Sequence, residues 1–120
     1  MSRVDPNIVI YHNPACGTSR NTLALLREKG LDPTVVEYLK TGWTREQLEG
    51  LLARMGVSAR EILRERGTKA AELGLTDPGA SDAMIIAAML IDPILVNRPI
   101  VETPKGAALC RPADVVLTLL

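Results

Sequence analysis

The cysteine at position 16 lies in the segment of this chain best suited to chemistry, Tyr11 to Arg20 (YHNPACGTSR). The apolar residues 8–10 before it predict a buried strand, and the apolar spacing after it predicts a helix. A cysteine at such a turn faces unpaired backbone N–H groups and the positive end of a helix dipole. That environment favours the nucleophilic thiolate, so we interpret Cys16 as reactive rather than structural. The same N–H groups can hold an oxyanion, so nucleophile and anion site coincide.

The residues around Cys16 have the character of a loop followed by a helix start. The flanking residue types favour loops and helix caps, namely Asn13, Pro14, Gly17, Thr18 and Ser19. His12 and Arg20 add potential positive charge near the sulfur. Ser19 has two interpretations: its hydroxyl donates a hydrogen bond to the Cys16 sulfur, or it caps the helix.

Spacing separates the chemistries that a cysteine at this turn can perform. Dithiol exchange needs a second cysteine at position 19, which is serine, and phosphatase chemistry of the Cys-x5-Arg kind needs arginine at position 22, which is Thr22. A Cys-His peptidase needs a positioned base, and the single histidine, His12, has no obvious partner to orient it. A zinc site lacks further ligands beside His12 and Cys16. The remaining chemistry is one activated thiolate whose reducing thiol comes from another molecule.

Composition limits the classes of partner. The chain has 120 residues, enough for one domain with its own core, and its 14 acidic residues balance 14 basic ones. We therefore expect no nucleic-acid partner, and no membrane partner, because the longest apolar stretch, 83–91, is far shorter than the ~20 residues of a membrane span. No cationic leader with an apolar core opens the sequence, so we expect no secretion signal. Two unclustered cysteines, Cys16 and Cys110, suit a reducing cytoplasm, although their pairing stays open at this point.

The first 40 residues predict the elements that position Cys16. Residues 7–11 predict a strand, Thr18 to Lys29 a helix ending at Gly30, and the β-branched residues at 34–38 a second strand. Two strands joined by a helix of this length form a βαβ unit, so the strands are expected to be parallel.

The middle of the chain predicts helices. Capping-box patterns open two of them, at Thr44 with Gln47 and at Ser58 with Glu61. The last is apolar on all sides, which indicates a buried helix. We expect four short helices, at 44 to Gly56, 58 to Gly67, Lys69 to Leu73, and Ser81 or Asp82 to Ile91.

The final segment returns to strands. Strand-like pieces lie at Leu95–Val96, Ile100–Val101 and Ala108–Cys110, with a hairpin turn at 103–106 between the last two. Pro112 opens a final helix, with Val115, Val116 and Leu119 directed inward. The element order predicts a single α/β domain over residues 1–120 with a helical insertion at about 44–91.

Three motifs of this chain resemble those of the glutaredoxin-coupled arsenate reductases of the ArsC family. They are His12 to Leu23 (HNPACGTSRNTL), Leu95 to Val101 (LVNRPIV) and Leu109 to Pro112 (LCRP), in order and at the expected distances. The resemblance covers nearly the whole chain. It implies a thioredoxin-like fold: a mixed sheet of about four strands flanked by helices, with an all-helical insertion between the second and third strands.

The resemblance also implies site residues. Cys16 corresponds to the nucleophile, Arg64, Arg98 and Arg111 to three oxyanion clamps, and Pro99 to a cis proline that faces the cysteine. The sequence itself supports Arg98 and Arg111, because each precedes a proline at the start of an element, where side chains can converge. Arg64 is selected by the family only, because the three arginines of segment 60–66 equally suit a solvated helix face. We expect Cys110 to be a packing residue.

The implied function is reduction of arsenate to arsenite through a Cys16 thiolate adduct, which glutathione and glutaredoxin resolve. Glutathione is then a co-substrate, no metal or bound cofactor is expected, and the setting is cytoplasmic arsenical resistance. Two alternatives stay open. One is a glutathione-dependent thiol oxidoreductase with another substrate. The other is a non-catalytic redox-regulatory protein of the same fold. The branch of the fold that binds RNA polymerase has a Cys-x-x-Cys pattern, which this chain lacks because position 19 is serine.

Overall fold

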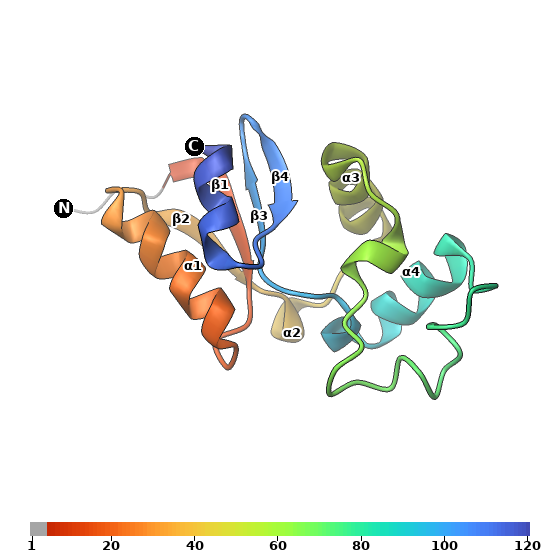
Figure 1. Ribbon diagram of the computed structural model, residues 1–120. Coiled ribbons are helices and arrows are strands. Elements are labelled where there is room, and N and C mark those ends of the chain that lie inside the picture. The colour runs from red at the N-terminus through yellow and green to blue at the C-terminus, as the bar shows by residue number, and fades with distance from the viewer. Residues whose placement is uncertain (1–4) are drawn as a thin grey trace. The chain divides into compact units, whose positions relative to one another are not determined.

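A computed structural model describes residues 5–120 and divides into two compact units (Figure 1). The sheet unit combines the chain up to Thr41 with Arg98–Leu120, and the helical unit is Gly42–Asn97. The helical segment therefore begins and ends a few residues outside the predicted 44–91.

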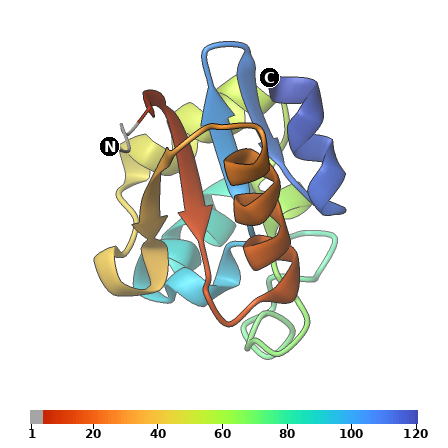
Figure 2. The same cartoon turned by 90° about the vertical axis from the view of Figure 1, so that its left-hand side faces the viewer.

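The sheet unit is built on four strands in the order β2-β1-β3-β4 (Figure 2). They are β1 (Asp5–His12), β2 (Pro33–Glu37), β3 (Ile100–Thr103) and β4 (Gly106–Leu109). β1 pairs in parallel with β2 and antiparallel with β3, and β3 and β4 form the antiparallel hairpin. The predicted mixed sheet, the parallel βαβ unit and the hairpin turn are confirmed.

Two helices pack against each other and against this sheet: α1 (Gly17–Glu28) and the 3-10 helix η3 (Ala113–Leu119) (Figures 1 and 2). A short helix, α2 (Tyr38–Thr41), follows β2. The core between α1, η3 and the sheet is apolar and contains Ile8, Ile10, Leu26, Val101, Cys110, Val116 and Leu119. Each large apolar side chain buried here contributes about 1.5–3 kcal/mol of transfer free energy, which holds α1 on β1. The final helix has the predicted inward residues but is a 3-10 helix.

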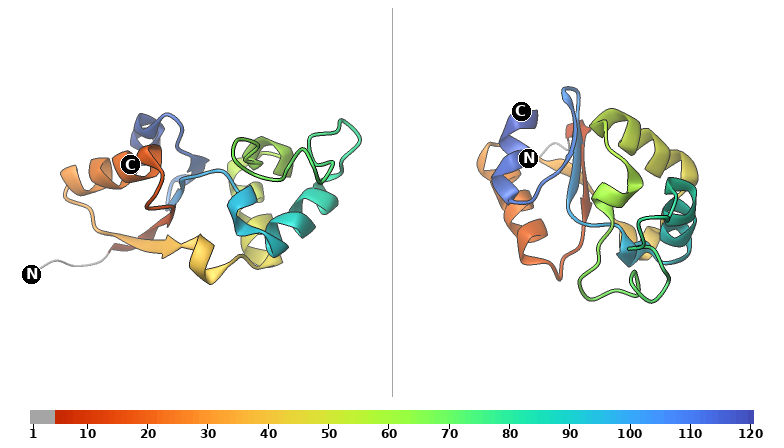
Figure 3. Two further views of the ribbon diagram at one scale, coloured as in Figure 1. Left: turned by 90° about the horizontal axis from the view of Figure 1, so that it is seen from below. Right: turned by 45° about the vertical axis from the view of Figure 1, so that its right-hand side comes forward.

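The helical unit contains α3 (Arg45–Met55), the 3-10 turn η1 (Ala59–Ile62), α4 (Asp82–Ile91) and the 3-10 turn η2 (Pro93–Leu95) (Figure 3). The capping box of α3 forms as predicted, since Gln47 N–H donates to Thr44 Oγ1 at 3.1 Å and Thr44 N–H donates to Gln47 Oε1 at 2.9 Å. α3 ends at Gly56 in the left-handed conformation, φ 66°. No helix in the described residues is long and apolar enough to cross a bilayer.

The predicted helix from Ser58 to Gly67 is wrong beyond its first turn. η1 stops at Ile62 because Leu63 forms an antiparallel bridge with Val96. Arg64 N–H also donates to Leu95 O at 2.7 Å, which keeps the backbone out of a helix. The strand expected at Leu95–Val96 is reduced to this bridge, because Leu95 belongs to η2.

The predicted helix at Lys69 to Leu73 is also wrong. One helical hydrogen bond forms there, from Leu73 N–H to Lys69 O at 2.9 Å, before Gly74 turns the chain with φ 74°. A single turn orders several residues for one hydrogen bond, so it does not propagate by itself.

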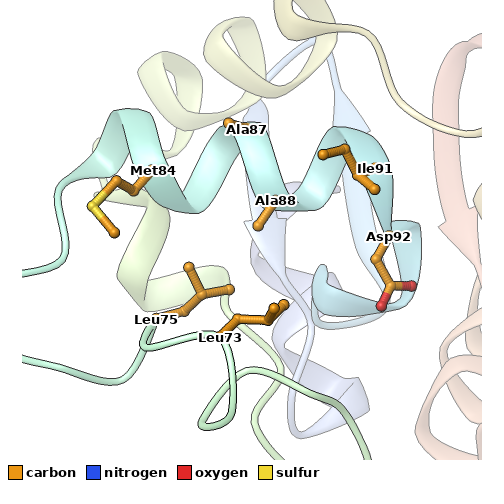
Figure 4. Close-up of a pocket in the computed structure, with 7 residues that line it drawn as sticks. All are labelled: Leu73, Leu75, Met84, Ala87, Ala88, Ile91 and Asp92. Carbon is orange, nitrogen blue, oxygen red and sulfur yellow. The ribbon is translucent and has the colours of Figure 1, made fainter.

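The fourth predicted helix is confirmed as α4, with the Ser81 side chain accepting from Met84 N–H. Its predicted burial is only half right. Ile85, Ile86 and Met89 are buried, whereas Met84 is 50% and Ile91 85% exposed. Figure 4 shows the exposed side, where a groove of about 390 Å³ is lined by Leu73, Leu75, Met84, Ala87, Ala88, Ile91 and Asp92.

Candidate active site

Cys16 occupies the turn between β1 and α1, where it is the N-cap residue of α1 and is half-buried. The turn is held by its own hydrogen bonds. Cys16 N–H donates to Asn13 O at 3.0 Å, and Ala15 N–H donates to Asn13 Oδ1 at 3.0 Å. On the outer side, Arg20 Nη1 donates to Pro14 O at 2.9 Å. The sulfur is therefore carried by a backbone with little freedom to move.

The environment of the sulfur favours its ionised form. Burial acts to raise the pKa of Cys16, but hydrogen bonds from the Ser19 backbone N–H and from the Arg98 and Arg111 side chains oppose it, as does the charge of Arg98. Together they lower the pKa of Cys16 from 9.0 to about 7. A substantial fraction of the sulfur is a thiolate at neutral pH.

Arg98 and Arg111 both approach the sulfur from the open end of the β3–β4 hairpin, where β3 begins beside the end of β4. Arg111 Nη1 lies 3.6 Å from Cys16 Sγ and donates to Arg98 O at 2.9 Å, which links the two residues. Each precedes a proline, and both the Arg98–Pro99 and the Arg111–Pro112 bonds are cis. The expected cis proline at Pro99 is confirmed, and its carbonyl accepts from Cys110 N–H at 2.9 Å.

Neither predicted role of the Ser19 side chain is correct. Its hydroxyl is fully buried, lies 2.6 Å from His12 Nδ1 and accepts from Asn13 N–H at 3.1 Å. It therefore neither donates to Cys16 nor caps α1. The group that reaches the sulfur is the backbone N–H of Ser19, one of the N-terminal donors that a helix leaves unsatisfied. The sequence indicated such donors at this turn but not which one reaches the sulfur.

His12 does not supply the positive charge expected of it. Burial lowers the pKa of its imidazole, the charges of Arg27 and Arg20 lower it further, and only Glu37 opposes them. The imidazole is consequently neutral at pH 7. Its contact with Ser19 ties the end of β1 to the first turn of α1, so His12 supports the turn rather than charging it.

The other supporting residues have local roles. Gly17 begins α1, and Thr18 contributes its carbonyl to a hydrogen bond from Thr22 Oγ1 at 2.8 Å. Cys110 lies in the apolar core, where burial raises the pKa of its thiol to about 12 despite a hydrogen bond from the Val101 backbone. Both cysteines are free thiols, and Cys110 packs as expected. Across residues 5–120, no three His, Cys, Asp or Glu side chains are grouped to hold a metal ion.

Arg64 belongs to the helical unit, so its oxyanion role stays a prediction. Its Nε donates to Arg66 O at 3.1 Å, and its Nη1 lies 3.5 Å from Asn97 Oδ1. Within the same segment, Arg60 is committed to structure, because its Nη2 donates to Asp77 O and Ala80 O at 2.8 and 3.0 Å. Arg60 is therefore a weaker candidate for the oxyanion role than the sequence suggested, when the three arginines of segment 60–66 could not be told apart.

Comparison with known proteins gives concordant matches. The model of the ArsC family matches residues 11–119. An arsenate reductase of Rhizobium meliloti (strain 1021) is 57% identical over 113 residues, which are 94% of this chain and 81% of the relative. One of Escherichia coli (strain K12) is 54% identical over 114 residues, 95% of this chain and 81% of the relative. The solved structure of an arsenate reductase from Vibrio cholerae is 41% identical with a TM-score of 0.89, covering 94% of this chain and 97% of its own.

Proposed function

Because this chain belongs to the ArsC family, we propose that it is an arsenate reductase that reduces arsenate to arsenite through Cys16. One observation carries the proposal. The Cys16 sulfur has a pKa lowered to about 7 and is hydrogen-bonded by the guanidinium groups of Arg98 and Arg111. A nucleophile and a site for a tetrahedral oxyanion are thereby combined in one place.

The arginines supply the oxyanion clamp. A guanidinium presents parallel N–H groups that bind two oxygens of a tetrahedral anion, and it stays charged at any working pH. We assign Arg98 and Arg111 to this role from their contacts with Cys16, and Arg64 from the family motif. Their charge both draws arsenate to the sulfur and offsets the negative charge that increases as the thiolate approaches.

The reaction begins with attack of the Cys16 thiolate on As(V). A sulfur–arsenic bond forms, one arsenic–oxygen bond breaks, and that oxygen leaves as water after taking two protons. A glutathione thiol then displaces a second oxygen as water and becomes bonded to arsenic. The glutaredoxin thiolate attacks the glutathione sulfur and forms a mixed disulfide with it. The electron pair of the bond broken between that sulfur and arsenic stays on arsenic, which becomes As(III). Hydrolysis releases arsenite and restores Cys16.

The second thiol has to come from outside the chain. Position 19 is serine, with its hydroxyl engaged by His12, and Cys110 is buried with a pKa raised to about 12. Neither residue can act as a resolving thiol beside Cys16. This supports glutathione and glutaredoxin as the reducing partners. From the family resemblance we also propose a cytoplasmic setting, a role in arsenical resistance and chemistry without a bound cofactor.

The test is a coupled assay that follows NADPH consumption with arsenate, glutathione, glutathione reductase and glutaredoxin. The wild-type chain should turn over arsenate, and Cys16→Ser should not. Cys110→Ser is the matched control, because it makes the same chemical change at the buried cysteine and should keep turnover. Full activity of Cys16→Ser, or no arsenate-dependent NADPH consumption by the wild type, would overturn the proposal.

A further inference from the structure

A second feature of the sheet unit is a groove that runs beside α1. Its volume is about 670 Å³, within the range of about 300–1,000 Å³ for small-molecule sites. Residues of α1 at helical spacing form one side, and the end of β1 and the Cys16 turn close it. The lining residues are His12, Pro14, Arg20, Leu23, Ala24, Arg27 and Glu28.

The near end of the groove adjoins the turn that carries Cys16, because Pro14 of that turn lines it. The Arg20 guanidinium donates to Pro14 O at 2.9 Å, and its Nη2 lies 3.7 Å from the position that a Cβ at Gly17 would occupy. Cys16 lies between Pro14 and Gly17 in the chain, so Arg20 places a positive charge against the turn that carries the sulfur.

The far end carries opposite charges side by side. Arg27 lies seven residues after Arg20, which is about 10.5 Å along a helix. Glu28 follows it, and among residues 5–120 neither Arg27 nor Glu28 takes part in an ion pair. Leu23 and Ala24 make the wall between the two ends apolar. The groove thus presents a cation, an apolar strip, and then a cation beside an anion.

The pKa of His12 reflects the positions of Arg20 and Arg27 in the groove. His12 lines the groove, and besides burial, which is the main cause, Arg27 and Arg20 both lower the pKa of its imidazole. Both guanidinium charges therefore act on the same buried side chain from α1.

We propose that this groove binds glutathione, with its glycine carboxylate at Arg20 and its γ-glutamyl amino acid group between Arg27 and Glu28; this rests on the proposed function. Glutathione has a carboxylate at one end and a carboxylate beside an ammonium group at the other, which is the complement of the groove. An extended chain of three residues spans about 10 Å, close to the separation of Arg20 and Arg27. The glycine end lies at the Cys16 turn, so the cysteinyl side chain of the middle residue can be directed toward the arsenic on Cys16.

The test uses three thiols and point variants at the far end of the groove. Glutathione, cysteinylglycine and γ-glutamylcysteine are compared as reductants, with arsenate and glutaredoxin held at saturation. A hydrogen bond to a charged group contributes enough free energy for about a tenfold effect. We expect Arg27→Ala to raise the KM for glutathione about tenfold and to leave the KM for cysteinylglycine, which lacks the γ-glutamyl group, unchanged. Glu28→Gln should act in the same direction. Lys29→Ala, which removes a positive charge at the same end of α1 but outside the groove, should behave as the wild type.

Direct binding separates this inference from the proposed function. Calorimetric titration of glutathione into Cys16→Ser needs no turnover, and adding Arg27→Ala to that variant should weaken binding about tenfold. Equal binding with and without Arg27, or an equal KM increase for glutathione and cysteinylglycine, would overturn the glutathione site. If glutathione binds as expected but the wild type does not turn over arsenate, the proposed function alone is refuted.

Discussion

Replacing Arg111 with glutamine tests how the sulfur of Cys16 is kept ionised. Arg111 Nη1 lies 3.6 Å from Cys16 Sγ, and it is one of three hydrogen-bond donors that overcome the effect of burial on the pKa of Cys16. Glutamine retains a side-chain N–H donor but removes the positive charge and the guanidinium. Because the Ser19 N–H and Arg98 remain, the pKa of Cys16 should rise only part of the way from about 7 towards 9.0.

The size of the effect follows from the free energy of the contact. A hydrogen bond to a charged group contributes about 1.5–3 kcal/mol, and loss of the lower amount decreases the acid dissociation constant of Cys16 about tenfold. The thiolate fraction at pH 7 then falls from about one half to about one tenth. The remaining thiolate is more basic and hence about threefold more nucleophilic, so the alkylation rate at pH 7 should fall only about twofold.

The measurement is therefore the full pH profile of alkylation by iodoacetamide, followed by mass spectrometry of the Cys16 peptide. Cys110 does not interfere, because it is buried and its pKa is about 12. For Arg111→Gln the midpoint should move up by about one pH unit. Lys29→Gln is the control, since it removes a positive charge about 20 Å along α1, beyond the Debye length of about 10 Å. If a folded Arg111→Gln protein keeps the wild-type midpoint, the guanidinium does not stabilise the thiolate.

Three further outcomes are expected. Ser19→Ala removes the partner of two buried groups, His12 Nδ1 and the Asn13 N–H, so chemical denaturation should show a loss of about 1–3 kcal/mol in the free energy of unfolding. In α4, Met89→Ala should lower the free energy of unfolding by about 2–5 kcal/mol, whereas Ile91→Ala should change it by less than about 0.5 kcal/mol because Ile91 is 85% exposed; equal losses would contradict the structure. Folding lowers the pKa of Cys16 from 9.0 to about 7, so its thiolate stabilises the fold in full above pH 9, and this contribution is lost as the pH falls through 7. Relative to Cys16→Ala, the free energy of unfolding of the wild type should therefore rise between pH 7 and pH 9, and a flat difference would refute the lowered pKa.

The parts of the fold that were predicted correctly depend on neighbours in the chain. The strand, turn and helix around Cys16, the capping box at Thr44 and the hairpin at 103–106 are each encoded within about a dozen residues. The thioredoxin-like arrangement follows from three motifs matched in order. The family motif also identified Arg98 and Arg111, which the structure brings to Cys16.

The predictions were wrong where the local structure depends on contacts with residues far away in the sequence. The helix after Ser58 ends early because Leu63 pairs with Val96, which lies far along the chain. The exposed side of α4 depends on which side chains of its own unit cover it, and apolar composition does not reveal that. At the site, burial lowers the pKa of His12, and the imidazole contacts the Ser19 hydroxyl. The hydrogen bond to the Cys16 sulfur comes instead from the Ser19 backbone N–H. Residue types alone do not show these contacts.

A spectroscopic titration of the wild-type thiol tests the central claim most directly. The ultraviolet absorbance of the thiolate is followed against pH, and Cys16→Ser supplies the baseline. Ionisation of one sulfur with a pKa of about 7 is predicted, because Ser19, Arg98 and Arg111 together outweigh burial. A single transition near 9.0, the ordinary cysteine value, would show that these groups do not hold a thiolate, and the proposed attack on arsenate at neutral pH would lose its basis.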